Sequence, residues 1–166
     1  LVNVSQTPFS TCYCTPTSTC TNEGIVNVTM GSLNNTSAMC SGGYSDFTSL
    51  GSQVSVVQGQ QIAISVTDTI NSNPSSAGVW IDYDHSGSFE ASEFTFLGST
   101  TVFGGTQMPY TFTGTINIPA SALTGATRMR VRGANSSTPV AASGSYGPCN
   151  GRTTVYGENE DYLITI

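Results

Sequence analysis

Short runs in which apolar and polar residues alternate recur along most of the chain and predict β-strands. The alternation is strict at residues 110–118, where every second residue is apolar or glycine, and it recurs at 127–132, where Met129 and Val131 alternate with arginines. In a strand, this period of two places one set of side chains toward a core and the other toward solvent. Clusters of Gly, Ser and Asn separate the runs, and we find no amphipathic helix. Further strands are expected at 25–30, 54–57, 61–67, 78–83, 94–97, 152–156 and 161–166.

About nine short strands at regular spacing predict an all-β fold, an antiparallel β-sandwich. The chain of 166 residues is long enough for one domain with its own core. We divide it into an extended Cys- and Thr-rich N-terminal arm at 1–23 and a β-sandwich domain at 24–166. Residues 58–60 predict a hairpin turn between two of the strands. The expected core consists of Ile25, Ile62, Ile64, Trp80, Phe112, Ile116, Met129, Val131, Tyr162 and Ile164.

The loop at 82–93 carries the clearest chemical signal. Acidic or hydroxyl side chains fall at its positions 1, 3, 5, 9 and 12, and Gly87 stands at position 6. This is the spacing of a calcium loop, because Ca²⁺ requires about six to eight oxygen ligands and alternate side chains of a tight loop converge on one point. The alternative is a polar hairpin loop whose acidity is coincidental. Strands rather than helices flank the loop, so we do not expect an EF-hand.

We predict that four side chains of this loop bind Ca²⁺, while Ser88 contributes its carbonyl oxygen and Glu90 acts through a water or not at all. The four side chains are Asp82, Asp84, Ser86 and Glu93. Two serines among the ligands lower the charge of the site. The expected affinity is therefore modest, in the extracellular range of about 10⁻⁴ M.

Composition limits the classes of partner. Charged residues make up 8% of the chain, Lys is absent and the net charge is −6. Nucleic acids and anionic membranes require a basic surface, so we expect neither nucleic-acid binding nor membrane insertion. A surface solvated by hydroxyls and amides is typical of secreted and cell-surface β proteins. The chain begins with Leu and has no leader and no stretch of about 18 apolar residues, so we interpret it as the mature segment of an extracellular protein.

Five cysteines in an extracellular chain predict disulfides. No C-x2-C pair is present, which argues against a structural zinc site. Two bridges among five cysteines allow 15 pairings. Among these we favour Cys14 with Cys149 and Cys20 with Cys40, which leaves Cys12 free or bridged to another chain.

Three arginines, Arg128, Arg130 and Arg132, share one face of a predicted strand. Glu158 and Glu160 have the same spacing near the C-terminal strand, so we expect a cross-strand ladder of ion pairs. Asp161 either joins this ladder or adds an oxygen to the calcium site. The alternative is that one arginine contacts an anionic or sugar ligand.

Evidence for catalysis is weak. His85, the only histidine, lies at a non-ligand position of the loop, and no G-x-S-x-G motif accompanies it. We therefore expect no catalytic residue and no enzyme activity.

The sequence also contains possible glycosylation sites. Acceptor motifs for N-glycans occur at Asn3, Asn27, Asn34, Asn35 and Asn135. Thr69 lies in an Asp-Thr-apolar motif for O-glycans.

Four motifs in order resemble the GEVED domain, a module of secreted and cell-surface bacterial proteins. They are Tyr13-Cys14-Thr-Pro, the segment 79–84 with Gly87 and Phe89, the TRMRVR segment at 127–132, and Gly157-Glu158-Asn159-Glu160-Asp161-Tyr162. Cys149 ahead of the last motif also fits, whereas Asn159 replaces the usual Val. The resemblance spans residues 13–166 and implies a secreted β-sandwich, usually an accessory module beside proteases, glycosidases or adhesive repeats, with no established catalytic activity.

Together these features predict a non-catalytic, extracellular, calcium-stabilised β-sandwich with a structural or adhesive role at the cell surface. In one version, copies of the chain assemble into a filament or a surface layer, with the N-terminal arm pairing with a neighbour's sheet edge. The alternative is a carbohydrate-binding accessory module of a secreted hydrolase, whose partner would be an extracellular polysaccharide.

Overall fold

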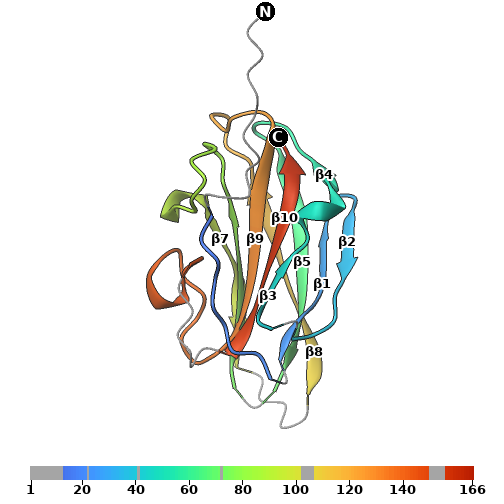
Figure 1. Cartoon of the computed structure of the whole chain (residues 1–166), viewed down its shortest axis with the longest axis vertical. Helices are drawn as coiled ribbons and strands as arrows, with labels where there is room; N and C mark the ends of the chain where they lie inside the picture. The colour runs from blue at the N-terminus through green and yellow to red at the C-terminus, as the bar shows by residue number, and fades with distance from the viewer. Residues whose placement is uncertain (1–12, 22, 41, 72, 102–106, 150–155) are drawn as a thin grey trace, which may run out of the picture.

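The computed structural model describes residues 13–21, 23–40, 42–71, 73–101, 107–149 and 156–166. They form two β-sheets with short 3₁₀ helices between some of the strands (Figure 1). The strands are β1 Gly24–Met30, β2 Leu33–Thr36, β3 Tyr44–Asp46, β4 Val54–Ser55, β5 Gln61–Ile70, β6 Ser75–Ile81, β7 Phe94–Thr100, β8 Met108–Asn117, β9 Ala126–Asn135 and β10 Tyr156–Thr165. The 3₁₀ helices are η2 Thr48–Leu50, η3 Ala91–Glu93 and η4 Gly144–Tyr146.

The two sheets confirm the all-β fold class. One sheet has the strand order β2-β1-β5-β8, and the other has the order β3-β10-β9-β6-β7, with β4 also pairing with β10. The prediction of purely antiparallel pairing is wrong at one edge, because β3 and β4 both run parallel to β10. Parallel pairing becomes available there since long connections, and not tight turns, join these strands to β10.

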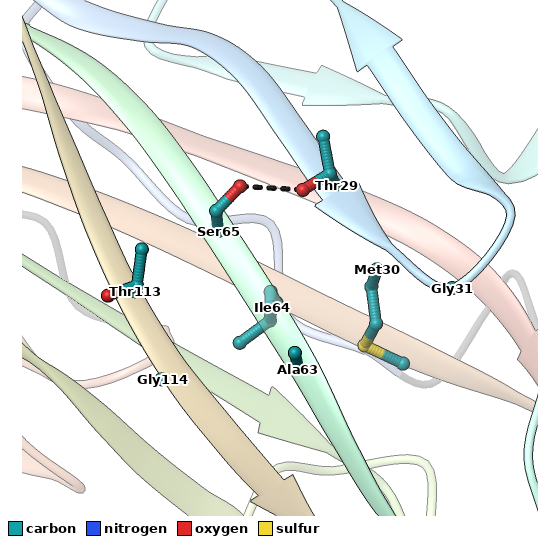
Figure 2. A pocket seen from close by; sticks show the side chains of 8 residues that line it. All are labelled: Thr29, Met30, Gly31, Ala63, Ile64, Ser65, Thr113 and Gly114. Atoms are coloured by element: carbon teal, nitrogen blue, oxygen red, sulfur yellow. Dashed lines mark hydrogen bonds between the residues drawn. The ribbon is translucent and has the colours of Figure 1, made fainter.

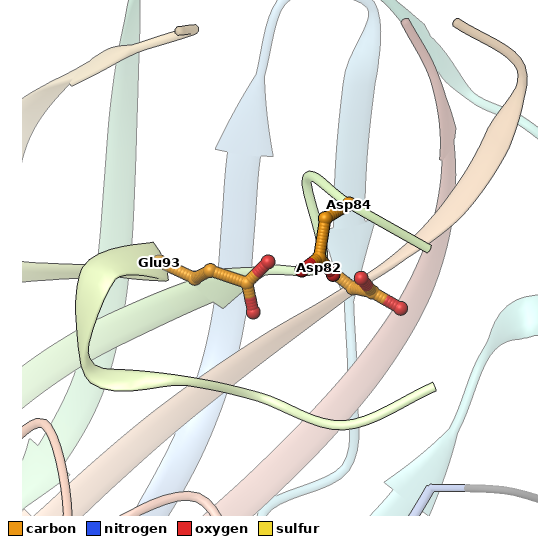
Figure 3. A group of neighbouring side chains, drawn as sticks. All are labelled: Asp82, Asp84 and Glu93. Carbon is orange, nitrogen blue, oxygen red and sulfur yellow. The ribbon is translucent and has the colours of Figure 1, made fainter. Parts of the chain in front are cut away.

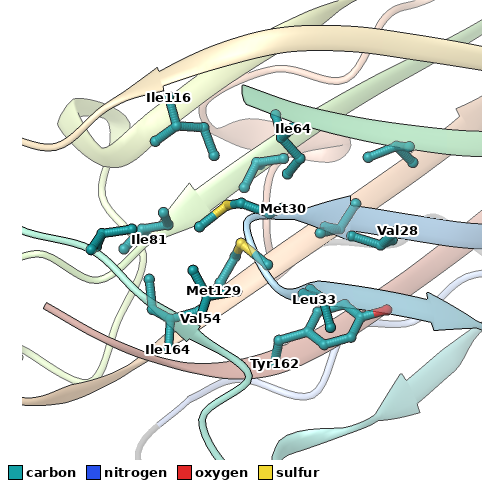
Figure 4. Packing of buried hydrophobic residues seen from close by; sticks show 14 of the residues in the cluster. Val28, Met30, Leu33, Val54, Ile64, Ile81, Ile116, Met129, Tyr162 and Ile164 are labelled. Carbon is teal, nitrogen blue, oxygen red and sulfur yellow. The ribbon is translucent and has the colours of Figure 1, made fainter. Parts of the chain in front are cut away.

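Apolar side chains from both sheets fill the space between them. Ile64 and Ile116 contribute from the four-stranded sheet, and Ile81, Met129 and Ile164 from the six-stranded sheet (Figure 4). Each is at most 2% exposed. The alternation read from the sequence therefore identified the inward-facing set, apart from two residues: Ile62 is only partly buried at the margin of the cluster, and Trp80 belongs to another cluster.

Trp80 is fully buried but lies outside this core. It belongs to a second cluster with Tyr13, Phe89, Ala134 and Val140. Its neighbours Val79 and Ile81 face the inter-sheet core, so the period of the strand turns Trp80 to the opposite face of β6. The N-terminal segment 13–21 and the loop that follows β9 therefore act as a partial third layer over the six-stranded sheet.

The turn at 58–60 is not a hairpin, contrary to the prediction. Gly59 turns the chain with φ +77°, but β4 pairs with β10 of one sheet, and β5 lies between β1 and β8 of the other. Burying Val54 and Val56 against the core requires β4 to cross to the second sheet. In the described residues, none of the helical segments is long and apolar enough to cross a membrane.

Candidate metal site

The predicted calcium loop connects β6 to β7 and ends in η3. β6 and β7 form an antiparallel pair. Two residues of the loop have left-handed backbone conformations, His85 with φ +56° and Gly87 with φ +78°. This coil directs two backbone amides at the first acid of the loop. The amide of Ser86 donates to Oδ1 of Asp82 at 3.0 Å, and the amide of Gly87 donates to its Oδ2, also at 3.0 Å. The Asp82 carboxylate is thereby held in place before any ligand binds.

Three acids of the loop converge, as Figure 3 shows. Asp82, Asp84 and Glu93 each offer a carboxylate oxygen, and these oxygens lie within 4.8 Å of one another. Asp82 and Glu93 are buried, whereas Asp84 is exposed. The group is therefore a buried acidic pair with one side open to solvent.

Backbone amides also fix the Glu93 carboxylate. Its Oε1 accepts from the amide of Tyr83 at 2.6 Å, and its Oε2 accepts from the amide of Glu90 at 3.0 Å. Burial nevertheless raises the pKa of the Glu93 carboxyl to about 8. A bound cation would favour the charged form of this group and reverse that shift.

The remaining predicted ligands form a network at the exposed side of the loop, which joins the group of acids through a side-chain hydrogen bond between Glu90 and Glu93. The Ser86 hydroxyl donates to both carboxylate oxygens of Glu90, at 3.2 and 3.3 Å, and the Ser88 hydroxyl donates to Glu90 Oε1. The Ser88 contact holds the pKa of the Glu90 carboxyl below its usual value. Glu90 does not belong to the converging group of acids.

The chemistry of these residues fits a hard divalent cation. Every donor is an oxygen, and three carboxylates supply the negative charge that Ca²⁺ requires. An oxygen that accepts one amide hydrogen keeps a second lone pair for a cation. If calcium binds, Asp82, Asp84 and Glu93 would hold it.

Tyr13 is a neighbour of the site that sequence reasoning missed. Its hydroxyl donates to Oδ2 of Asp82, and its ring lies against Phe89 with a centroid distance of 5.1 Å. The Arg128 guanidinium stacks over the same ring at 4.6 Å. Burial raises the pKa of the Tyr13 hydroxyl, so it remains a donor at neutral pH. The available signal was its place in the Tyr13-Cys14-Thr-Pro motif.

The arginine ladder is buried on the outer face of β9. Arg130 forms a bidentate ion pair with Asp161, with Nε–Oδ1 at 2.6 Å and Nη2–Oδ2 at 2.7 Å. Arg128 reaches the same carboxylate at 3.2 Å and Asp46 at 3.8 Å. Arg132 donates to the carbonyl of Gly147, and burial lowers its pKa to about 10. Arg130 and Arg132 are fully buried and Arg128 is 6% exposed, so none of the three presents its guanidinium to an outside ligand.

The prediction that Glu158 and Glu160 form ion pairs with the three arginines is wrong. Asp161 stands opposite Arg130 in the β9–β10 register, whereas Glu160 stands opposite Val131 and faces the interior. Glu158 accepts from the amide of Cys40 at 3.3 Å. The parity of a strand decides which residues share a face, and the two glutamates have the parity of the core-facing Tyr162. For the same reason Asp161 belongs to the arginines and not to the calcium loop.

Two disulfides join the cysteines of the described residues, in the expected pairs. Cys14 bonds to Cys149 and Cys20 bonds to Cys40. The first bridge ties the segment beside Tyr13 to the loop that precedes β10, and the second ties that segment to the connection between β2 and β3. The N-terminal arm is therefore pinned to the sandwich from residue 13 onward, while Cys12 lies outside the described residues.

The glycan acceptor motifs differ in access. Asn34 is exposed and Asn27 is half-buried, both on the outer face of the four-stranded sheet, where Nδ2 of Asn27 donates to Oδ1 of Asn34 at 2.9 Å. Half-buried Asn35 donates to the Tyr162 hydroxyl. The Thr69 hydroxyl donates to the carbonyl of Gly24. Asn135 is only 2% exposed, so the folded chain cannot present it as an acceptor. Asn3 lies outside the described residues.

A shallow hollow of about 390 Å³ lies on the four-stranded sheet. Figure 2 shows Thr29 and Ser65 joined by a hydrogen bond of 2.6 Å at its rim, with Ala63 and Thr113 nearby. Small side chains create the hollow, and no aromatic ring lines it. It therefore offers hydroxyls to a ligand but no stacking surface.

Comparison with known proteins covers the second half of the chain. The model of the GEVED domain family matches residues 76–165, a shorter span than the resemblance drawn from the individual motifs. No curated protein matches the chain. The matched span contains the acidic loop, the arginine strand and the strand that supplies Asp161, and it covers more than half of the sequence. The chain therefore belongs to the GEVED domain family.

Proposed function

We propose that this chain is a non-catalytic, extracellular β-sandwich that Ca²⁺ stabilises at the loop 82–93 and that has a structural or adhesive role at the cell surface. The observation that carries the proposal is the convergence of the three carboxylates of Asp82, Asp84 and Glu93 within 4.8 Å. Like charges this close repel one another, and a divalent cation is the simplest group to neutralise them. The two disulfides agree with an oxidising compartment.

The role of the cation in this proposal is mechanical. Asp82 and Glu93 stand at the two ends of the loop, so an ion between them clamps the end of β6 to the start of β7. The bond from Tyr13 to Asp82 extends the clamp to the N-terminal segment and its disulfide. A charge-poor protein outside the cell, where calcium is abundant, would gain rigidity from such an ion.

Self-assembly into a filament or surface layer is the version that we favour. Two exposed apolar side chains, Val57 and Leu123, support it, because they are 66% and 50% exposed on turns that meet near the loop. Gln58 donates to the carbonyl of Ala122 at 2.6 Å, and the amide of Leu123 donates to the carbonyl of Tyr83 at 2.7 Å. A second copy that covered this end of the sandwich would remove both side chains from water.

Light scattering and negative-stain imaging in calcium and in chelator test this version. We expect calcium to raise the melting temperature and to promote oligomers, and V57S/L123S to abolish the oligomers without loss of fold. M108S is the matched control, since Met108 is 41% exposed on β8. A strict monomer at high concentration in calcium would contradict the assembly, whereas a melting temperature indifferent to chelator would contradict the calcium site.

The alternative is a carbohydrate-binding accessory module, which the hydroxyl-lined hollow favours. A polysaccharide pull-down distinguishes the two functions. Binding that T113K abolishes would support the module, because a lysine side chain at that position would fill the hollow.

A further inference from the structure

The interior of the sandwich contains a group of acids separate from the calcium loop. Asp68 of β5 and Glu158 and Glu160 of β10 are each 0% exposed. Asp68 Oδ2 accepts from the Ser75 hydroxyl at 2.9 Å and would lie 3.0 Å from a Cβ added at Gly133, so it faces β6 and β9 across the interior. Carboxylates from both sheets thus meet at one end of the core.

In the part of the chain that the structure describes, several polar atoms of this acid group have no hydrogen-bond partner. They are Oδ1 of Asp68, Oε1 of Glu160, and both amide atoms of Asn135, which is paired with Ser75 across β6 and β9. Leaving a buried polar atom unsatisfied costs about 1–3 kcal/mol, and burying an ionised carboxylate costs more. The group therefore carries a cost in free energy that a proton on a carboxylate would reduce.

The surroundings supply acids and neutral groups. Glu23, which precedes β1, adds another carboxylate near Asp68, and the Tyr162 hydroxyl donates to Glu160. Arg128 and Arg130 bind Asp161 on the opposite face of the same sheet, and Arg132 points to Gly147 there. Arg152, the remaining basic residue of the chain, lies outside the described residues.

A metal ion does not fit this group. Among the described residues, the acids whose ligand atoms converge within 4.8 Å are Asp82, Asp84 and Glu93, and the Asp68 group is not among them. A proton makes no such demand on geometry, since it needs one carboxyl oxygen and removes the charge completely.

We propose that Asp68 and Glu160 are held as neutral carboxylic acids between the two sheets and that their ionisation weakens this end of the sandwich. A protonated oxygen becomes a donor for a neighbouring oxygen, such as the unpartnered amide oxygen of Asn135. The shift in pKa agrees with this geometry, because burial raises the pKa of each carboxyl to about 7 from 3.8 for Asp68 and 4.5 for Glu160. The charges of Glu158 and Glu23 add to the shift at Asp68, and those of Glu158 and Asp68 add to the shift at Glu160.

The sign of the resulting pH dependence follows from linkage. As the pH rises from about 4 to about 7, the unfolded chain loses these protons while the folded chain keeps them. The contribution of these two groups to stability is therefore largest in acid, falls across this window and levels off above the folded pKa. Each retained proton changes the unfolding equilibrium constant about tenfold per pH unit within the window.

The test uses the full chain at saturating calcium, so that the loop carboxylates stay ionised. Infrared difference spectra at pH 6 should contain the C=O band of protonated carboxyl groups in the wild-type chain, and D68N/E160Q should lack it. The double variant should also lose the fall in stability between pH 4.5 and 7. If it does not fold, D68N and E160Q separately should each remove part of the band. D46N, which neutralises an acid on the outer face, is the control and should keep the band.

Two results would overturn the proposal. One is a wild-type spectrum at pH 6 without the carboxylic acid band. The other is a fall in stability over this pH window that D68N/E160Q leaves unchanged. A second bound Ca²⁺ in equilibrium dialysis that D68N/E160Q removes would assign the group to a cation and overturn it as well. Failure of calcium binding at the loop alone would affect the proposed function and leave this inference standing.

Discussion

Tyr13 donates a hydrogen bond from its hydroxyl to Oδ2 of Asp82, across 69 residues of sequence. One partner adjoins the Cys14–Cys149 disulfide, and the other is the first acid of the candidate metal loop. The bond joins the N-terminal segment to the loop, so a substitution in one of them should change the stability of the other.

Tyr13→Phe should destabilise the chain by about 1.5–3 kcal/mol, because it removes a buried hydrogen bond to a charged acceptor. It should also weaken calcium binding, since Asp82 loses one of the contacts that orient it. Chemical denaturation and calorimetric titration measure the two effects. Tyr156→Phe, at a residue that is 40% exposed, should change neither, and equal effects of the two variants would exclude a specific role for Tyr13.

Glu93→Gln should abolish most of the calcium-dependent rise in melting temperature, whereas Glu90→Gln should leave most of it. The two residues lie in one loop, but only Glu93 belongs to the converging carboxylates. The Glu90 carboxylate instead accepts hydrogen bonds from the Ser86 and Ser88 hydroxyls. Thermal melts with and without chelator compare them. A larger loss in the Glu90 variant would reverse the assignment of the ligands.

Arg130→Met should cost about 3–5 kcal/mol, because it leaves the buried Asp161 with Arg128 as its remaining cation. Arg128→Met should cost less, since Asp161 keeps both bonds from Arg130. In a double-mutant cycle, Arg130→Met with Asp161→Leu should be less destabilising than the sum of the single changes. Additive effects in urea denaturation would show that the pair is not coupled.

Removal of the two disulfides should have unequal effects. Cys14 and Cys149 are 135 residues apart, and Cys20 and Cys40 are 20 apart. Loop-closure entropy predicts a loss of about 5 kcal/mol for Cys14→Ser/Cys149→Ser and about 3 kcal/mol for Cys20→Ser/Cys40→Ser. Guanidinium unfolding of the two paired variants provides the comparison, and the reverse order would indicate that local packing outweighs chain entropy.

Gly157→Ala should cost about 2–6 kcal/mol. Gly157 has φ +136°, and a Cβ there would lie 2.2 Å from the carbonyl oxygen of Gly133 on β9. Gly59 also has a positive φ, but a Cβ there would meet nothing within 4 Å, so Gly59→Ala should cost only about 1 kcal/mol. Denaturation of the two variants separates backbone strain from the clash, and similar losses would mean that β10 shifts to admit the methyl group.

The loop at 82–93 could be predicted because its signal is local. The spacing of oxygens and the position of Gly87 lie within twelve residues, and the structure brings Asp82, Asp84 and Glu93 together as that spacing requires. Tyr13 carries no such local signal, because its contact with Asp82 depends on how the chain crosses the outer face of the six-stranded sheet.

The sequence by itself determined the longer strands, the all-β class and the family, since alternation and short motifs express the two-residue period of a strand. It missed the short strands β2 and β3, and residues 152–155 of the strand expected at 152–156 lie outside the described residues. Tertiary structure alone decided which neighbours those faces meet. Arg130 pairs with Asp161, while Glu158 and Glu160 turn inward toward Asp68. The reason is register: moving the pairing of two strands by one residue exchanges the faces of every side chain, and long-range packing against the core selects one register.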